Sequence, residues 1–469
     1  MRLISAAYHL LWGDLFFLPL PGSSSVGISL LVLLLIPAGV FFTIRTKVLP
    51  IRLFPEMLRI STEKQTSGKK NAISGLQALI VSTATRVGMG NMVGVVAAIS
   101  AGGAGAVFWM WVTALIGSST AFVEATLAQL HKEDDPLYGG YRGGPAYYIH
   151  NLFTKGKQKR WNIIAVLFAL SGLLCWCGIS QVISNSVSSS FYNAFALPPI
   201  VSTVILVALA AVIILRKNAT VKVLDVVVPV MAGFYFLIAL FIIVKNYTLL
   251  PGVFQRILEE AFGLRQAVAG GFGAALMNGV KRGLFSNEAG SGSAPCAAAS
   301  AHVSHPAKAG LLQAFGVIID TIIICTCTAM IMLLAPAELL EGLSGMALLQ
   351  TAMQYHFGYA GVVFVAITLW LFCFSTFIGI LYYARSNVAY LFGDNWKSQT
   401  AYKILALVML FIGGLAAYTF VWDLGDIGVG LMTIFNMAAI LPMSGQAIQS
   451  LNEYTALRKQ EKAAAKRSK

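Results

Sequence analysis

Apolar stretches long enough to cross a membrane recur along the whole chain, and short polar segments separate them. A membrane-spanning helix needs about 20 apolar residues, because the hydrocarbon core of a bilayer is about 30 Å thick. The predicted spans are residues 27–43, 74–101, 104–130, 161–193, 198–215, 223–244, 267–301 (interrupted), 309–335, 360–384, 402–420 and 425–447. The pattern predicts an all-α polytopic membrane protein with about eleven spans, since the alternating segments of about ten residues that a β-barrel needs do not dominate.

Small and polar residues interrupt two of these spans near their centres. The first interruption is "TRVGMGNMVGV" (residues 85–95), and the second is "FSNEAGSGSAP" (residues 285–295). Asn91 and Asn287 lie 196 residues apart, and each interruption opens a set of five spans. Because five is odd, the second set enters the membrane from the opposite side. Broken helices at matching positions of inverted halves point to a transport site at the membrane midplane.

A broken helix frees backbone N–H and C=O groups, which is tolerated in a membrane only beside a cavity or a ligand. The glycines of 87–90 allow the turn, and Asn91 is expected to be the N-cap of the half-helix that follows. At the second break we expect Ser291 or Ser293 to cap and Pro295 to lie in the first turn. The N–H groups of a half-helix suit a carboxylate, and freed carbonyls suit a hard cation such as sodium. The breaks therefore predict a zwitterion and a cation as cargo.

Six charged residues lie deep in the predicted spans, namely Arg86, Lys281, Arg282, Glu124, Glu288 and Asp320. We expect them to pair with one another, for instance Arg282 or Arg86 with Glu288 or Glu124, rather than to contact a ligand. Close helix packing would explain glycines at the breaks, but it does not explain the polar residues beside them.

Ser375 and Thr376 are adjacent hydroxyl residues in the middle of the span 360–384. Such hydroxyls commonly bond back to the carbonyl one turn earlier, and for an isolated pair this interpretation is favoured. Here the span is the third helix of the second repeat, so a cation site between this pair and the first break is also consistent with the pattern.

Composition supports the membrane assignment and argues against an enzyme. Hydrophobic residues make up 57% of the 469 residues and charged residues 11%, with a mean hydropathy of +0.76, whereas soluble domains contain about 25% charged residues. The histidines lie near span ends or in loops, with no Ser-His-Asp or metal-binding constellation. The cysteines fall in apolar segments, and the two members of each C-x-C pair point to different sides of a helix, so no zinc site is indicated.

The net charge of +14 comes from basic residues between the spans rather than on one compact face, so nucleic-acid binding is not indicated. With the N-terminus outside, the predicted cytoplasmic segments hold 26 of the 33 Lys and Arg residues, and the outer segments hold four. This bias predicts a cytoplasmic C-terminus. Segments 51–60 and 144–152 are expected to be short helices in the membrane interface, and the tail is expected to be a basic helix that meets anionic lipids.

The predicted organisation has five segments. They are an extra N-terminal helix with a basic cytoplasmic interfacial segment (1–73), a first five-helix repeat (74–244), an outer connection (245–266), a second five-helix repeat (267–447) and a basic cytoplasmic tail (448–469).

At these motifs the chain resembles the sodium:alanine symporter family, also called the alanine or glycine:cation symporters. The matching stretches are "RVGMGNMVGVVAAISAGGAGAVFWMWVTALIG", "EATLAQL", "GGPAYYI", "KRGLFSNEAGSGSAP", "GVIIDTIIICTCTAMIML" and "LFCFSTFIGILYY". They cover nearly the whole chain in the family's order. The resemblance implies a leucine-transporter-type fold of five plus five inverted helices with one extra N-terminal helix. It also implies sodium-driven uptake of small neutral amino acids at the cytoplasmic (inner) membrane of a prokaryote.

The resemblance further implies which residues form the sites. The substrate site would fall on Gly88, Gly90, Asn91, Phe285, Ser286, Asn287 and Thr376. The sodium site would use Ser375, Thr376 and the backbone carbonyls of Arg86, Val87 and Gly88. The chain departs from the family pattern at Met89, where a threonine is usual, at Ile183, where a glutamine is usual, and at Ile380, where a tryptophan is common. Ile380 and Met89 should leave room for a side chain as long as that of glutamine.

Two other functions remain open on the same fold. The loss of family side chains at the site would also suit a sensor that binds an amino acid without transporting it. Glu288 or Asp320 could instead couple uptake to protons. The sequence predicts no cofactor besides the coupling sodium ion and no partner besides the amino acid, sodium and the lipid bilayer, and it carries no signal for an oligomeric state.

Overall fold

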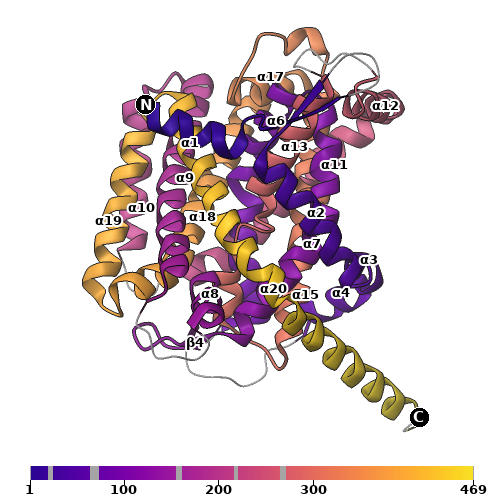
Figure 1. Cartoon of the computed structure of the whole chain (residues 1–469). Helices are drawn as coiled ribbons and strands as arrows, with labels where there is room; N and C mark the ends of the chain where they lie inside the picture. Colours follow the sequence, from indigo (N-terminus) through magenta and orange to yellow (C-terminus); the bar gives the residue numbers. More distant parts are fainter. Residues whose placement is uncertain are drawn as a thin grey trace.

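The computed structural model describes residues 2–19, 25–63, 73–154, 161–215, 220–264 and 271–467, and helices dominate this part of the chain (Figure 1). Each predicted span coincides with a helix or a broken helix. They are α2 (Leu30–Arg45), α5–η1–α6 (Gly75–Thr85, Arg86–Gly94, Val95–Gly102), α7 (Gly105–Leu130), α9 (Ile163–Phe195), α10 (Pro199–Ile214), α11 (Thr220–Lys245), α13 and α14 (Gly271–Asn287, Ala294–Ser300), α15–η3–α16 (Pro306–Val317, Ile318–Cys325, Thr326–Leu333), α18 (Tyr359–Phe392), α19 (Trp396–Gly413) and α20 (Tyr418–Arg467). The all-α polytopic architecture is confirmed.

Shorter elements surround this bundle. They are α1 (Arg2–Trp12), α3 (Leu49–Arg52), α4 (Phe54–Ser61), α8 (Pro145–Thr154), η2 (Tyr247–Leu249), α12 (Leu250–Ala261), η4 (Ala337–Leu339) and α17 (Met346–Phe357). Three two-stranded pairings connect loops: β1 (Phe16–Pro19) with β2 (Ser25–Ile28), β3 (Ile73–Ser74) with β6 (Ala301–His302), and β4 (Glu133–Asp134) with β5 (Tyr141–Arg142). The first and last pairs are antiparallel and the middle pair is parallel. The predicted interfacial segment 51–60 is split between α3 and α4, and 144–152 forms most of α8.

The outer surface of α11 shows why this bundle needs a membrane. Its exposed apolar residues are spaced three or four positions apart, on one stripe of the helix. They are Val230, Phe234, Leu237, Phe241 and Val244, which are 67%, 57%, 60%, 55% and 63% exposed. In the described residues, seven helical segments are long and apolar enough to span a bilayer, and they include the broken segment Gly75–Gly102.

The turn before the last span lies earlier in the chain than predicted. The sequence placed it at 421–424, but α19 ends at Gly413 and α20 begins at Tyr418. Gly413 and Gly414 end α19 where it packs closely on its neighbours, because a Cβ at these positions would lie 2.2 Å from the Gln181 Cα and 2.0 Å from the Thr203 Oγ1. From Tyr418 one helix of 50 residues runs through the bundle and emerges beyond it, as Figure 1 shows at the C-terminus.

Helices α9 and α18 lie antiparallel in the interior, and this pairing sets the level of the site. The Tyr359 hydroxyl at the start of α18 donates to the Ala194 carbonyl at the end of α9. Further along, the rings of Trp176 and Tyr383 lie 6.1 Å apart. Ile183 is seven residues after Trp176, so it lies about two turns further along the same face of α9.

Candidate substrate and cation site

The first broken helix is interrupted over only two residues. Between Arg86 and Gly94 the backbone is helical except at Val87 (φ −73°, ψ 73°) and Gly88 (φ −154°, ψ −136°), and all nine residues are buried. The helix after the break wedges against two other helices. A Cβ on Gly88 would lie 2.1 Å from the Thr376 Oγ1, and one on Gly90 would lie 2.9 Å from the Ser286 Cα. Glycine is required at both positions because these contacts leave no space for a side chain.

The cap of the half-helix differs from the prediction. Asn91 is not the N-cap, since it lies three residues after Gly88, within the helical segment. Its Oδ1 accepts a hydrogen bond from the Gly88 N–H at 2.9 Å, as the third residue of a capping box does. The next N–H, on Met89, donates to the Thr376 Oγ1 at 3.1 Å. The side chain reaches back to the break because glycine, which has no side chain, occupies the cap position itself.

The second break runs from the end of α13 at Asn287 to the start of α14 at Ala294. Its chain reverses through left-handed backbone at Glu288 (φ +58°), Gly290 (φ +99°) and Gly292 (φ +83°). Pro295 lies in the first turn of α14, as predicted, but the side chain of Ser293 makes no cap hydrogen bond. The Ser291 hydroxyl instead donates to the Glu288 carbonyl at 2.8 Å, within the loop.

A buried polar cluster joins the first break to the second repeat. The Asn91 Nδ2 donates to the Asp320 Oδ1 at 2.8 Å and to the Asp320 backbone oxygen at 3.0 Å. The Ser286 hydroxyl, near the end of α13, donates to the Asp320 Oδ2 at 2.9 Å, and the Thr321 hydroxyl donates to the same atom at 2.6 Å. The Cys325 sulfur lies 3.2 Å from both the Asn91 Nδ2 and the Ser286 Oγ.

Asp320 is the acidic group at the centre of this cluster, and it is fully buried. Among the described residues no Lys, Arg or His nitrogen lies within 4.0 Å of its carboxylate. Taking a carboxylate out of water is unfavourable unless hydrogen bonds and an opposite charge compensate it. The three hydrogen-bond donors supply part of this compensation, so the site is able to accept a cation or a proton.

One of the two hydroxyls of α18, that of Thr376, lies against the first break. Both bond back within their own helix, since Ser375 and Thr376 donate to the Phe372 carbonyl at 2.9 and 2.8 Å. Thr376 also accepts from Met89, so its oxygen lies at the break itself. The local hydrogen bond that mid-helix hydroxyls usually make is therefore compatible with a position beside the break.

Ile380 lies on the face of α18 that carries Thr376 and Tyr383, the residues through which this helix contacts the two breaks. Thr376, one turn before it, touches the first break, and the Tyr383 hydroxyl, about one turn after it, donates to the Glu288 Oε2 of the second break at 3.2 Å. Trp176 of α9 packs on Tyr383, and Ile183 lies on the same side of α9 as Trp176. The sequence did not single out Trp176 or Tyr383, because an aromatic residue in an apolar span carries no signal of its own.

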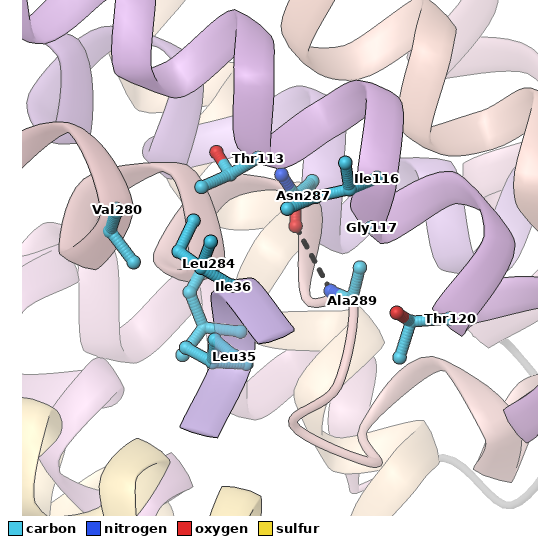
Figure 2. A pocket seen from close by; sticks show the side chains of 10 residues that line it. All are labelled: Leu35, Ile36, Thr113, Ile116, Gly117, Thr120, Val280, Leu284, Asn287 and Ala289. Carbon is cyan, nitrogen blue, oxygen red and sulfur yellow. Dashed lines mark hydrogen bonds between the residues drawn. The ribbon is translucent and has the colours of Figure 1, made fainter. Parts of the chain in front are cut away.

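Asn287 is predicted to bind substrate, but its side chain faces a different cavity. Figure 2 shows this cavity, which α2, α7 and α13 enclose and which Leu35, Thr113, Gly117 and Leu284 help to line. It has a volume of about 20 Å³, enough for one water molecule. The Asn287 Oδ1 accepts from the Ala289 N–H at 3.0 Å, as the dashed line in Figure 2 marks. The Asn287 side chain thus stabilises the backbone of the second break through this hydrogen bond.

The predicted pairing of the deep charges was wrong. Lys281 and Arg282 both bind Asp426 of α20, at 2.8 and 2.9 Å. Arg86 donates to the Gln313 Oε1 at 3.0 Å. Glu124 accepts from Asn436. Asp426 was overlooked because it falls at the start of a predicted span, next to the misplaced turn.

Phe285 lies on the Asp426 side of the cluster. Its ring lies 4.9 Å from that of Trp422, and the Arg282 guanidinium stacks on Trp422 at 4.0 Å. A Cβ on Gly94 would meet the Phe285 ring at 3.7 Å, which is ordinary contact. Phe285 therefore separates the polar cluster at the first break from the ion pairs of Lys281 and Arg282.

Comparison with known proteins places this arrangement in a family. The chain is 45% identical over 434 residues to the probable sodium/glutamine symporter GlnT of Bacillus subtilis, covering 92% of this chain and 88% of that protein. It is 34% identical to the sodium/alanine symporter AgcS of Methanococcus maripaludis, covering 92% and 95%. The solved structure of MhsT in complex with L-phenylalanine has a TM-score of 0.56 at 14% identity, covering 80% of this chain and 89% of that one.

This structural likeness shows the fold, and the sequence relatives show the family. A family model described as the sodium:alanine symporter family matches residues 22–468. The protein is a multi-pass membrane transporter and not an enzyme, and the chain belongs to the sodium:alanine symporter family.

Proposed function

We propose that this transporter carries a small neutral amino acid into a prokaryotic cell together with sodium, across the cytoplasmic (inner) membrane. In this proposal the N-terminus is outside and the C-terminus is in the cytoplasm, as the distribution of basic residues favours. Both cargoes bind at the first broken helix, between α13 and α18.

The amino acid is assigned to the N-terminal end of the half-helix after the break. The N–H groups of Gly88 and Met89 already have side-chain partners, so the carboxylate is assigned to the next N–H groups, those of Gly90 and Asn91. The positive end of a helix dipole favours a carboxylate there. Ser286 lies against Gly90 and is the polar contact from the second repeat. Phe285 and the backbone at Asn287 complete this side of the pocket.

Sodium is assigned to the other side of the break. The carbonyls of residues 86–88 end the first half-helix, and helix ends leave carbonyls without intrahelical partners. Thr376 of α18 lies at the break, Ser375 precedes it in the same helix, and both hydroxyls also donate to the Phe372 carbonyl. The Thr376 hydroxyl at the break supports the assignment, because hydroxyl and carbonyl oxygens suit a hard cation.

The observation that carries the proposal is the double contact of the break, with Ser286 through Gly90 and with Thr376 through Gly88 and Met89. The test is uptake of labelled amino acid by proteoliposomes under a sodium gradient, with choline as the replacement ion. Sodium-dependent accumulation is expected. Binding without exchange in a counterflow assay would instead identify a sensor and contradict the proposal.

The substrate is proposed to be neutral and to include side chains longer than that of alanine. Ile380 replaces a large ring on the face of α18 that links the two breaks, and Met89 is a flexible side chain that can move aside. One relative is described as a probable sodium/glutamine symporter, which supports a pocket of that size. Acidic amino acids are expected to fail, because Lys281 and Arg282 are already paired with Asp426.

Proton coupling is the second candidate, and Asp320 is the observation that favours it. A buried carboxylate without a basic partner within ion-pair distance in the described structure can take up a proton during the transport cycle. The uptake assay distinguishes the two ions. Full uptake in choline that varies with pH, and that Asp320→Asn removes, would favour protons over sodium.

A further inference from the structure

A second region that gathers charge lies far from the substrate site, where α20 leaves the bundle. There α3 and α4 lie beside α20 (Figure 1), and the Tyr454 hydroxyl of α20 donates to the Glu56 Oε1 of α4 at 2.5 Å. A hollow of about 340 Å³ opens between α20 and the turn from α2 to α3. Its polar lining consists of Arg45, Thr46, Lys47, Arg52, Asn452, Thr455 and Lys459. We refer to it as the basic hollow.

Among the residues that the structure describes, no carboxylate balances the basic residues of this hollow. Arg52 donates to the Thr46 carbonyl at 3.0 Å, and Arg45 donates to the Ser444 hydroxyl at 3.0 Å. Both partners are neutral. In the described part of the chain, none of Arg45, Lys47, Arg52 and Lys459 forms an ion pair with an acidic side chain. Four positive charges therefore converge on one concavity and remain available to an anion.

The acidic residue of the adjoining hollow is already paired with basic residues. Glu56 lines an adjoining hollow of about 440 Å³ that shares Arg52 and Lys459 with the basic hollow. It accepts from Arg59 at 2.8 Å and from Arg458 at 2.9 Å. Burial raises the pKa of Glu56, but hydrogen bonds from Arg59 and Tyr454 and the two guanidinium charges outweigh this and lower its pKa to about 2. Glu56 stays ionised at neutral pH and is neutralised by its own partners.

Apolar side chains next to the basic residues project away from the protein. Ile44, Val48 and Ile51 are 69%, 45% and 73% exposed, and they alternate along the chain with Arg45, Lys47 and Arg52. Isolated exposed apolar residues need no explanation. Here three exposed apolar residues lie beside a cationic hollow at the edge of a membrane protein. The hollow suits the charged headgroup of a phospholipid, and the apolar residues suit its acyl chains.

The general excess of basic residues on this side does not account for the arrangement. Positive charges that only set orientation can project separately into water. Here they come from two segments about 400 residues apart in the chain and face one hollow. The turn that carries Lys47 and Val48 holds both in left-handed backbone (φ 56° and 52°), a conformation that is unfavourable for a β-branched residue.

We propose that the basic hollow binds the phosphate headgroup of an anionic phospholipid, with the acyl chains along Ile44, Val48 and Ile51. Arg45, Lys47, Arg52 and Lys459 supply the positive charge, and Asn452 and Thr455 supply hydrogen bonds to the headgroup. This lipid would tie α2, α3 and α20 together at the membrane surface. The site goes beyond the proposed transport function, because neither the amino acid nor sodium takes part in it.

Native mass spectrometry of the full chain in a neutral detergent tests this proposal. Phosphatidylglycerol is added in one arm, phosphatidylcholine in a second and inorganic phosphate in a third. Phosphatidylglycerol should remain bound and the other two should not. Equal retention of phosphatidylcholine would overturn the proposal, and displacement of phosphatidylglycerol by millimolar phosphate would identify a free phosphate site instead. These arms use the unmodified protein and need no variant.

Variants then locate the lipid. The double variant Arg52→Gln/Lys459→Gln should bind phosphatidylglycerol about 25-fold more weakly, since each basic residue near an anionic lipid surface contributes about a fivefold effect and two such effects multiply. The matched control, Lys397→Gln/Lys466→Gln, removes two exposed charges outside the hollow and should bind as the unmodified protein does. The charge-conserving Arg52→Lys/Lys459→Arg variant should also retain the lipid. Unchanged binding in the first variant, or equal loss in the control, would contradict the assignment.

Discussion

The side chain of Asn91 connects the two halves of the transporter through its two ends. Its Oδ1 accepts from the Gly88 N–H at 2.9 Å, and its Nδ2 donates to the Asp320 carboxylate at 2.8 Å. Gly88 belongs to the first broken helix, whereas Asp320 belongs to η3 in the second half of the chain. A change at Asp320 therefore reaches the break through one amide group.

This contact predicts strong coupling between the two residues. Asn91→Ala and Asp320→Asn should each weaken amino-acid binding, but the double variant should lose less than the sum of the two. Residues in direct contact show interaction free energies of about 0.5–3 kcal/mol in such cycles. The measurement is the dissociation constant of the amino acid in the four proteins. The same cycle with Asn91→Ala and Asp426→Asn is the control, and it should be additive.

The tight contact of Gly88 with α18 predicts a steric effect. A Cβ on Gly88 would lie 2.1 Å from the Thr376 Oγ1, whereas one on Gly94 in the same segment would lie 3.7 Å from its nearest neighbour, the Phe285 Cδ1. Gly88→Ala should abolish uptake and destabilise the protein by about 1–3 kcal/mol, the usual range for overpacking. Gly94→Ala should keep both uptake and thermal stability. Normal uptake by a well-expressed Gly88→Ala protein would show that the break is not wedged against α18.

A substitution at Ser375 should change the sodium dependence of uptake without changing the preference among amino acids. Ser375→Ala removes a proposed sodium ligand and keeps the shape of α18, so the sodium concentration needed for half-maximal uptake should rise. The order of preference among amino acids should not change. Ser386→Ala, nearer the C-terminal end of the same helix, is the control. It should leave the sodium dependence and the order of preference unchanged. If Ser375→Ala keeps the sodium dependence of the unmodified protein, the sodium site lies elsewhere.

Ile380 predicts the size of the pocket. Ile380→Trp adds a ring between the contacts of α18 with the two breaks, so longer substrates should lose affinity relative to alanine. An apolar pocket discriminates by about 1–3 kcal/mol per methylene group, so the preference should be graded. Competition by the twenty amino acids against labelled alanine measures it. An unmodified protein restricted to alanine and glycine, with no change in Ile380→Trp, would remove Ile380 from the pocket.

The sequence predicted the spans and both breaks because these depend on local composition. An apolar run of about 20 residues predicts a membrane-spanning helix. Glycines and a polar residue such as Asn91 are conspicuous within such a run. Contacts between segments that are distant in the sequence were harder to predict. Asp426 could have been found as an acidic residue in the last span, but pairing with Lys281 and Arg282 depends on how α13 packs on α20.

The role of Asp320 illustrates the same limit at the site. Its sequence "GVIIDTIIIC" identifies a deep carboxylate but not its neighbours. The contacts with Asn91 and Ser286 arise only when η3 meets both broken helices. Asn287 shows the converse, because the family resemblance assigned it to the substrate site together with Ser286. Successive residues of a helix point about 100° apart, and this rotation turns Asn287 toward α2 and α7 instead.

The claim that sodium and the amino acid share the first break is tested most directly by isothermal titration calorimetry on the purified protein. The amino acid is titrated with saturating sodium and with choline, and sodium is titrated with and without the amino acid. Because binding free energies are linked reciprocally, each ligand should tighten the other by the same factor, about 5–150-fold for a typical coupling of 1–3 kcal/mol. An amino-acid dissociation constant that is the same in sodium and in choline would contradict the shared site.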